Sequence, residues 1–125
     1  SPVQLPESAL LSPSSYSFLL CTGHVAHGVP PYFRPPFYRQ TYYSRLSLFY
    51  TEKGTFQIYK KLDELENEFK DMGFVRAHLS FLVNMRYITK ISSYVMTLTT
   101  GKKIPVPKAR YAQVKREYML YKGEE

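Results

Sequence analysis

The chain has 125 residues, a length that suits one domain with a hydrophobic core and argues against a second independent domain. Its 17 lysine and arginine residues against 10 aspartate and glutamate residues give a formal net charge of +7, which favours contact with a polyanion such as nucleic acid or an anionic membrane face. The longest apolar run near the start, Phe18 to Cys21, is too short to span a bilayer, and one cysteine excludes an intramolecular disulfide, so we expect a soluble cytoplasmic protein without a membrane partner.

The first third of the chain is rich in proline and serine. Residues 1 to about 40 contain all but two of the nine prolines, including the run from Pro30 to Pro36. Proline fixes φ and lacks a backbone donor, so continuous helices or strands cannot pass through such patches. We therefore expect an arm or linker over residues 1–40 and a folded domain over residues 41–125. Short extended pieces of the arm, at Tyr16–Leu20 and Phe37–Tyr43, could still pair with the domain.

A hairpin and a helix are expected next. Apolar and polar residues alternate over Leu46–Thr51 and again over Phe56–Ile58, on either side of a turn at Glu52–Gly54, which predicts a β-hairpin. A helix beginning near Lys61 is predicted because apolar residues recur at spacings of three, four and three at Leu62, Leu65, Phe69 and Met72. Gly73 can take the left-handed conformation just past the end of that helix.

The second half of the chain reads as strands followed by one more helix. Strands are predicted at Phe74–Val83, Tyr87–Ser92, Tyr94–Thr99 and Lys103–Val106. Pro107 ends the last strand and can open a helix on which Tyr111, Val114, Tyr118 and Tyr121 share one face. Twelve tyrosines and eight phenylalanines also favour strands. The predicted fold class is therefore mainly β (α+β), with antiparallel strands and two short helices.

Catalytic and metal-binding chemistry finds little support in the sequence. Cys21, His24 and His27 have a spacing that could place three ligands around zinc, but a structural zinc site usually has four and no fourth is evident, so ordinary loop residues are the favoured interpretation. No signature of an activated nucleophile and no glycine-rich phosphate loop is present. The acidic cluster that follows Leu62 is best interpreted as the solvated face of a helix. We expect no enzymatic activity, no cofactor and no small-molecule substrate.

Positive charge is placed where a polyanion could be reached. The cations at predicted strand ends and turns are Arg45, Arg76, Arg86, Lys90, Lys102, Lys103, Lys108 and Arg110. Long side chains at such positions can reach phosphates without losing burial elsewhere. For any single lysine, a basic solvated rim is the simpler interpretation.

Residues 74–88 carry a more specific signal, because β-forming residues there alternate with polar groups. The informative positions are Phe74, Arg76, His78, Ser80, Phe81, Leu82, Val83, Asn84 and Ile88. At these positions the segment resembles the central signature of the LytTR family of DNA-binding output domains. Leu79 departs from the family pattern, which more often has a polar residue there. The resemblance covers about Tyr42 to Tyr121 and implies an elongated β fold that inserts loops, and no recognition helix, into successive major grooves.

The resemblance also implies roles for individual residues. It places Arg45 on a first loop, His78, Leu79 and Ser80 on a second, and Pro107 to Arg110 on a third. It implies base reading by Arg45 and by Lys108 or Arg110, while His78 and Ser80 hold the DNA backbone. Leu79 cannot make a hydrogen-bonded base contact, but it could meet a thymine methyl group. Arg76 and Asn84 complete the expected DNA-binding set, although Asn84 could instead satisfy backbone groups at a strand end.

These observations lead to one function and two alternatives. The expected function is sequence-specific binding of double-stranded DNA by a bacterial transcription regulator, such as a response regulator of a two-component system. The resemblance further implies a homodimer on paired DNA repeats. One alternative is a protein-interaction module that uses exposed aromatic residues and the proline-rich arm. The other is a binder of single strands or RNA, because aromatic residues interleaved with cations can stack bases.

Overall fold

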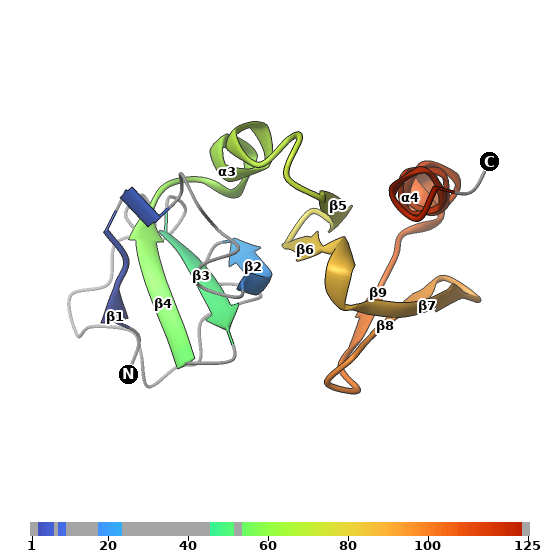
Figure 1. The fold of residues 1–125 in the computed structure, drawn as a ribbon, viewed down its shortest axis with the longest axis horizontal. Helices are drawn as coiled ribbons and strands as arrows, with labels where there is room; N and C mark the ends of the chain where they lie inside the picture. The colour runs from blue at the N-terminus through green and yellow to red at the C-terminus, as the bar shows by residue number, and fades with distance from the viewer. Residues whose placement is uncertain (1–2, 7, 10–17, 24–45, 52–53, 124–125) are drawn as a thin grey trace.

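The computed structural model describes residues 3–6, 8–9, 18–23, 46–51 and 54–123, with the backbone alone for residues 18–23. The described elements form an elongated molecule (Figure 1). A six-stranded sheet with α3 (Leu62–Glu68) lies toward one end, and a three-stranded sheet with α4 (Lys108–Tyr121) lies toward the other. The strands dominate, as the sequence predicted, and the antiparallel mainly β fold with two helices is confirmed.

The six-stranded sheet has the order β1, β4, β3, β2, β6, β5. These strands are β1 (Val3–Gln4), β4 (Gly54–Tyr59), β3 (Leu46–Thr51), β2 (Phe18–Gly23), β6 (Phe81–Asn84) and β5 (Phe74–His78). The predicted hairpin is confirmed, because β3 and β4 pair from Leu46 opposite Tyr59 to Thr51 opposite Gly54. The expected alternation along β3 is wrong, since its first four residues are all buried. Successive side chains of a strand point to opposite faces, and both faces are covered here, since Phe49 belongs to the core cluster of Leu62 and Leu65 while Tyr50 packs against the cluster that contains Val75.

Strand β2 comes from the segment in which the sequence predicts an arm. It pairs with β3 on one side and with β6 on the other. The expectation that residues near Tyr16–Leu20 could pair with the domain is thus confirmed from Phe18 onward, while Phe37–Tyr43 lies outside the described residues. The domain boundary near residue 40 stays a prediction.

Helix α3 covers one face of the six-stranded sheet. Its core-facing residues, Leu62 and Leu65, are buried together with Phe69, whose ring centroid lies 4.8 Å from that of Phe74. The helix ends before the predicted Met72, which is 45% exposed. Gly73 has a φ of +82°, as expected for the residue that turns the chain after a helix.

The single strand predicted over Phe74–Val83 is wrong. The structure divides this segment into β5 and β6, which pair as a hairpin around a turn at Leu79 and Ser80. The physical reason is that side chains near the turn bind its backbone groups, as described below. These bonds offer the backbone an alternative to a continuous strand.

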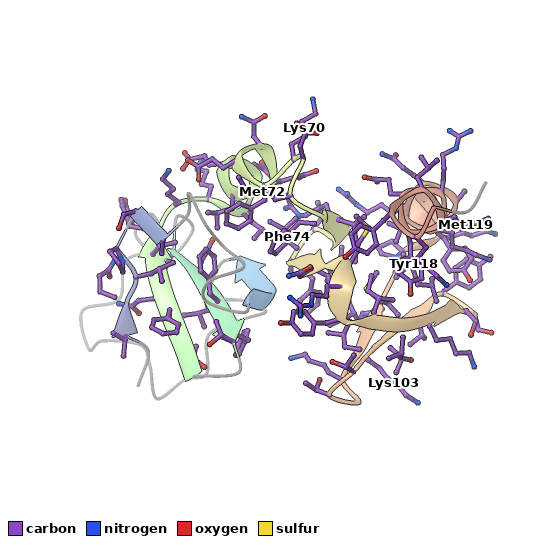
Figure 2. All side chains as sticks on the ribbon, in the orientation of Figure 1. Lys70, Met72, Phe74, Lys103, Tyr118 and Met119 are labelled. Carbon is purple, nitrogen blue, oxygen red and sulfur yellow. The ribbon has the colours of Figure 1, made fainter. Side chains whose placement is uncertain are left out.

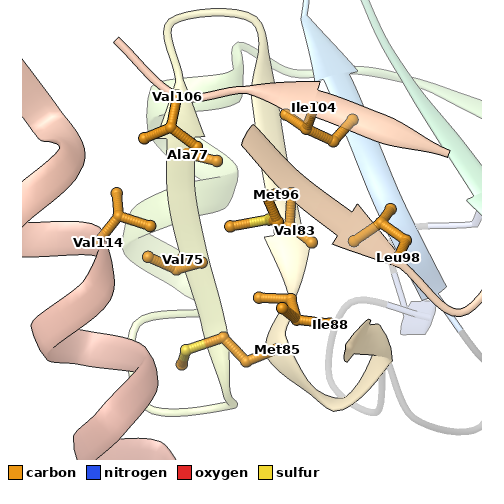
Figure 3. Close-up of a cluster of buried hydrophobic side chains, with 10 residues drawn as sticks. All are labelled: Val75, Ala77, Val83, Met85, Ile88, Met96, Leu98, Ile104, Val106 and Val114. Carbon is orange, nitrogen blue, oxygen red and sulfur yellow. The ribbon is translucent and has the colours of Figure 1, made fainter. Parts of the chain in front are cut away.

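The second sheet has the order β7, β8, β9 and packs with α4 against β5. Its elements are β7 (Ile88–Ser92), β8 (Val95–Leu98) and β9 (Lys103–Pro105), and a short 3-10 helix, η4 (Met85–Tyr87), precedes it. The buried cluster in Figure 3 consists of Val75, Ala77, Val83, Met85, Ile88, Met96, Leu98, Ile104, Val106 and Val114. Strands β5 and β6 therefore contribute to the six-stranded sheet and also to the core beneath α4.

Candidate nucleic-acid interface

The β5–β6 turn is held by the side chain of Arg76. The guanidinium donates to two backbone carbonyl oxygens of the turn, with Nε 3.0 Å from the oxygen of His78 and Nη2 2.6 Å from that of Leu79. Its Nη1 lies 2.8 Å from a carboxylate oxygen of Asp63 and 2.8 Å from one of Glu66, both on α3. The Arg76 side chain is only 8% exposed. We call Arg76, with the Asp63 and Glu66 carboxylates and the two backbone carbonyl groups that it binds, the Arg76 clamp.

His78 and Ser80 complete the interior of the turn. The backbone N–H of Ser80 donates to Nδ1 of His78 over 3.0 Å, so the neutral imidazole carries its proton on Nε2. The Ser80 side chain is buried, and its hydroxyl has no hydrogen-bond partner among the residues that the structure describes. It therefore presents no surface to DNA in this conformation. Leu79, between them, is 65% exposed and stands at the tip of the turn.

Asn84 has the structural role that the sequence left open as an alternative. Its Oδ1 accepts a hydrogen bond from the backbone N–H of Arg86 over 3.1 Å and thereby caps η4. The guanidinium of Arg86 lies 5.8 Å from the centre of the Tyr87 ring. These contacts organise the connection between the two sheets.

The third predicted loop is the first turn of a helix. Pro107 occupies the N-cap of α4, and the backbone N–H of Arg110 donates to the Pro107 carbonyl oxygen over 2.9 Å. Lys108 and Ala109 are exposed and Arg110 is partly exposed. The positive end of the helix dipole adds to the charge of these side chains, which favours an anion at this position.

The strand pairings place the start of β3 and the β5–β6 turn at the same end of the six-stranded sheet. Strands β3 and β6 both run antiparallel to β2, so both begin at the same end of the sheet, where β5 ends. The β5–β6 turn therefore lies at the end of the sheet where β3 begins. Arg45 itself, the residue before β3, lies outside the described residues.

The start of α4 is tied to β5 through the core. Val106, immediately before the N-cap Pro107, belongs to the same buried cluster as Ala77 (Figure 3). Ala77 is followed directly by His78 and the turn. The second and third predicted regions therefore both follow directly on residues of one core cluster.

The remaining predicted cations do not share one surface. Lys90 is exposed on β7, and the Lys102 ammonium lies 5.3 Å from the centre of the Tyr50 ring. In Figure 2, Lys103 lies on the side of the three-stranded sheet away from α4. The exposed cations of α4, Lys115 and Arg116, were not singled out from the sequence, although their place on a predicted helix was visible.

Asp63 and Glu66 are the residues of the site that sequence reasoning missed. They were interpreted as part of a solvated helix face, whereas both bind Arg76. Their spacing of three on α3 places them on one side of the helix, which is a signal that could have been used. The strand that provides the cation follows α3 after one turn.

The metal site considered at Cys21, His24 and His27 is not tested by the described residues. Cys21 lies in β2, and His24 and His27 lie outside the described residues. Within the part of the chain that the structure describes, no three metal-ligating side chains gather into one group. No helix among the same residues has the length and apolar character needed to cross a membrane.

Comparison with known proteins assigns the family. The model of the LytTr DNA-binding domain matches residues 40–119, which is more than half of the chain. A solved LytTr DNA-binding domain, assigned to a methyl-accepting/DNA response regulator from Bacillus cereus, is 18% identical in sequence with a TM-score of 0.56. The match covers 82% of this chain and 81% of that one, and it shows a shared fold. No curated protein matches the chain. The resemblance seen in the sequence is thus confirmed, and the chain belongs to the LytTr DNA-binding domain family.

Proposed function

We propose that this domain binds double-stranded DNA in a sequence-specific manner as the output domain of a bacterial transcription regulator. The β5–β6 turn and the first turn of α4 enter successive major grooves. The observation that carries the proposal is that these two segments are joined through one core cluster, in a chain whose family is defined by DNA binding. A shared core fixes the distance between the turn and the helix start. A fixed distance is needed because the spacing of successive major grooves in a duplex is itself fixed.

The first turn of α4 supplies the hydrogen bonds to bases. Lys108 is exposed and Arg110 partly exposed. An arginine fork can donate two bonds to O6 and N7 of guanine, which distinguishes guanine from the other bases in the major groove. Lys115 and Arg116, further along the same helix, are exposed and add contacts to phosphates.

We propose roles for the predicted residues that differ in part from those expected from the sequence. We propose that Arg76 positions the turn and does not contact DNA, because Asp63 and Glu66 already bind its guanidinium. Asn84 caps η4, and Ser80 fills the interior of the turn. His78 remains a proposed phosphate contact through the N–H at Nε2. Arg45 remains a proposed base contact on the first loop.

The biological setting follows from the same proposal. The domain acts in the cytoplasm, recognises paired repeats as a homodimer on DNA, and has no catalytic function of its own. Regulation then depends on where the domain binds, and any sensing step lies outside the DNA-reading surface.

The dependence of affinity on salt tests the proposal. If the domain makes about six phosphate contacts, the plot of log affinity against log salt concentration has a slope near −5, measured by fluorescence anisotropy on a labelled duplex. Replacing Lys115 and Arg116 together with alanine should reduce the slope by about 2. Lys103→Ala is the matched control, because this cation lies on the other side of the three-stranded sheet from α4.

Sequence discrimination is tested separately with Arg110→Ala. The variant should lose about 1 to 3 kcal/mol of discrimination among duplex sequences if Arg110 reads a base. An equal loss on every sequence would assign Arg110 to the DNA backbone.

A slope near zero for the unmodified domain would contradict duplex binding altogether, and capture of a protein partner by such a domain would favour the interaction module. Stronger binding to single strands in a competition assay would favour the stacking alternative.

A further inference from the structure

We infer that Leu79 recognises the C5-methyl group of thymine in the major groove, and that the Arg76 clamp holds it in position. The inference rests on the proposed function, because it assigns one specificity-determining contact to the proposed DNA-reading turn. It concerns a residue that cannot read a base by hydrogen bonding, at the exposed tip of a turn in which the neighbouring Ser80 side chain is buried.

The exposure of Leu79 is the first observation. Among the exposed large apolar side chains of the described residues, Leu79 has the greatest exposed fraction, 65%. It stands at the tip of a two-residue turn between β5 and β6. Burying such a side chain against an apolar group recovers free energy that the isolated domain leaves unused.

The hydrogen bonds that hold its backbone are the second observation. The carbonyl oxygens of His78 and Leu79 both accept from Arg76, and the N–H of Ser80 donates to His78. Bonds to the side chain of Arg76 or His78 therefore fix the peptide groups before and after Leu79. A contact made from a preorganised turn loses less conformational entropy on binding than one made from a mobile loop.

The anchoring of the clamp is the third observation. Asp63 and Glu66 hold the Nη1 atom of Arg76 from α3, so the position of the turn depends on the helix that packs over the sheet. The two carboxylates also balance the charge of Arg76. The tip of the turn thus presents an apolar side chain, without the strong local attraction for phosphate that an unpaired arginine would give.

The chemistry of the major groove identifies the ligand. Thymine presents an apolar C5-methyl group there, and cytosine, adenine and guanine do not. A leucine can discriminate in favour of that methyl group by removing it from water. Uracil differs from thymine only at this position, so it is the probe that isolates the contact.

The experiment is a thymine-to-uracil scan. A binding site is first selected from a random duplex pool, and each thymine is then replaced singly by uracil. For the unmodified domain, at least one replacement should weaken binding about fourfold, the value expected for exposing one methyl-sized group. Leu79→Ala should bind the thymine and uracil versions of that site equally. Leu120→Ala, which changes a leucine that is 59% exposed on α4, should retain the fourfold difference.

The clamp is tested with Arg76→Lys, which retains the charge but loses the fork that joins two carbonyl oxygens. It should reduce the thymine-to-uracil difference while leaving the salt slope unchanged. Arg76→Gln also removes the charge, so a decrease of about 1 in the slope for this variant would show that Arg76 contacts a phosphate and would overturn the clamp. Urea unfolding of each variant confirms that the compared domains are folded.

The outcomes separate this inference from the proposed function. A domain that binds duplex DNA with equal affinity for every uracil-substituted site overturns the inference and leaves the proposed function standing. A difference that persists in Leu79→Ala assigns the methyl contact to another residue and also overturns it. A domain that does not bind duplex DNA overturns the proposed function itself.

Discussion

Removal of the Arg76 side chain is expected to destabilise the domain by about 2 to 4 kcal/mol. The variant Arg76→Ala loses two hydrogen bonds from a charged donor to the carbonyl oxygens of His78 and Leu79. A bond to a charged group contributes about 1.5 to 3 kcal/mol, and water can replace part of this at the exposed Leu79 carbonyl. The carboxylates of Asp63 and Glu66, 82% and 48% exposed, become hydrated in the variant and add about 0 to 1 kcal/mol each.

The assay is equilibrium unfolding in urea, monitored by circular dichroism. Arg76→Ala should lower the midpoint without changing the m-value, since the surface exposed on unfolding stays the same. Asp63→Ala and Glu66→Ala should each cost about 0 to 1 kcal/mol, because either carboxylate is exposed and leaves the carbonyl bonds in place. Arg116→Ala, an exposed cation on α4, is the matched control and should lie within about 0.5 kcal/mol of the unmodified domain.

Two results would refute the reasoning. If Asp63→Ala destabilised the domain as much as Arg76→Ala, the ion pair and not the carbonyl bonds would hold the turn. If Arg76→Ala cost less than about 0.5 kcal/mol, the bonds between Arg76 and the turn would not stabilise the folded state.

Two further predictions concern contacts with α4. Gly73→Ala should cost about 1 to 2 kcal/mol because φ is +82° and an added Cβ would lie 3.2 Å from Tyr121 Cε1, whereas Gly101→Ala, at φ +89° with no neighbour within 4 Å, should cost less. Equal losses in thermal unfolding would show that Tyr121 moves away freely. Tyr118→Phe should cost about 1 kcal/mol, since the hydroxyl donates to the Ile88 carbonyl oxygen over 3.0 Å. An unchanged midpoint in urea would show that this bond adds nothing to stability.

Local patterns predicted the hairpin and the two helices. The hairpin of β3 and β4 follows from alternation and a turn, and α3 follows from apolar residues spaced by three and four. The predicted face of α4 is partly right, because Val114 is buried and Tyr118 packs against the core, whereas Tyr121 is 46% exposed. Each helix meets the core with one face, and this is the condition under which periodicity is informative, whereas the hairpin was found although the first four residues of β3 are all buried.

The missed features depend on contacts between distant segments. The turn at Leu79 and Ser80 contains no glycine, proline or asparagine, so it has no strong local signal. It forms because Arg76, held by Asp63 and Glu66, binds its carbonyl oxygens. The sequence showed a cation at position 76 and acids on a helix, but only the packing of α3 beside β5 brings them together.

The place of β2 in the sheet has a consequence for defining the minimal unit that folds. The strand occupies the middle of the six-stranded sheet, although it precedes the segment that the family model matches. A fragment cut at residue 40 would expose the hydrogen-bonding backbone of β3 on one side of the gap and of β6 on the other. Uncovered strands of this kind recruit other chains, so such a fragment would be prone to self-association and unsuited to solution work.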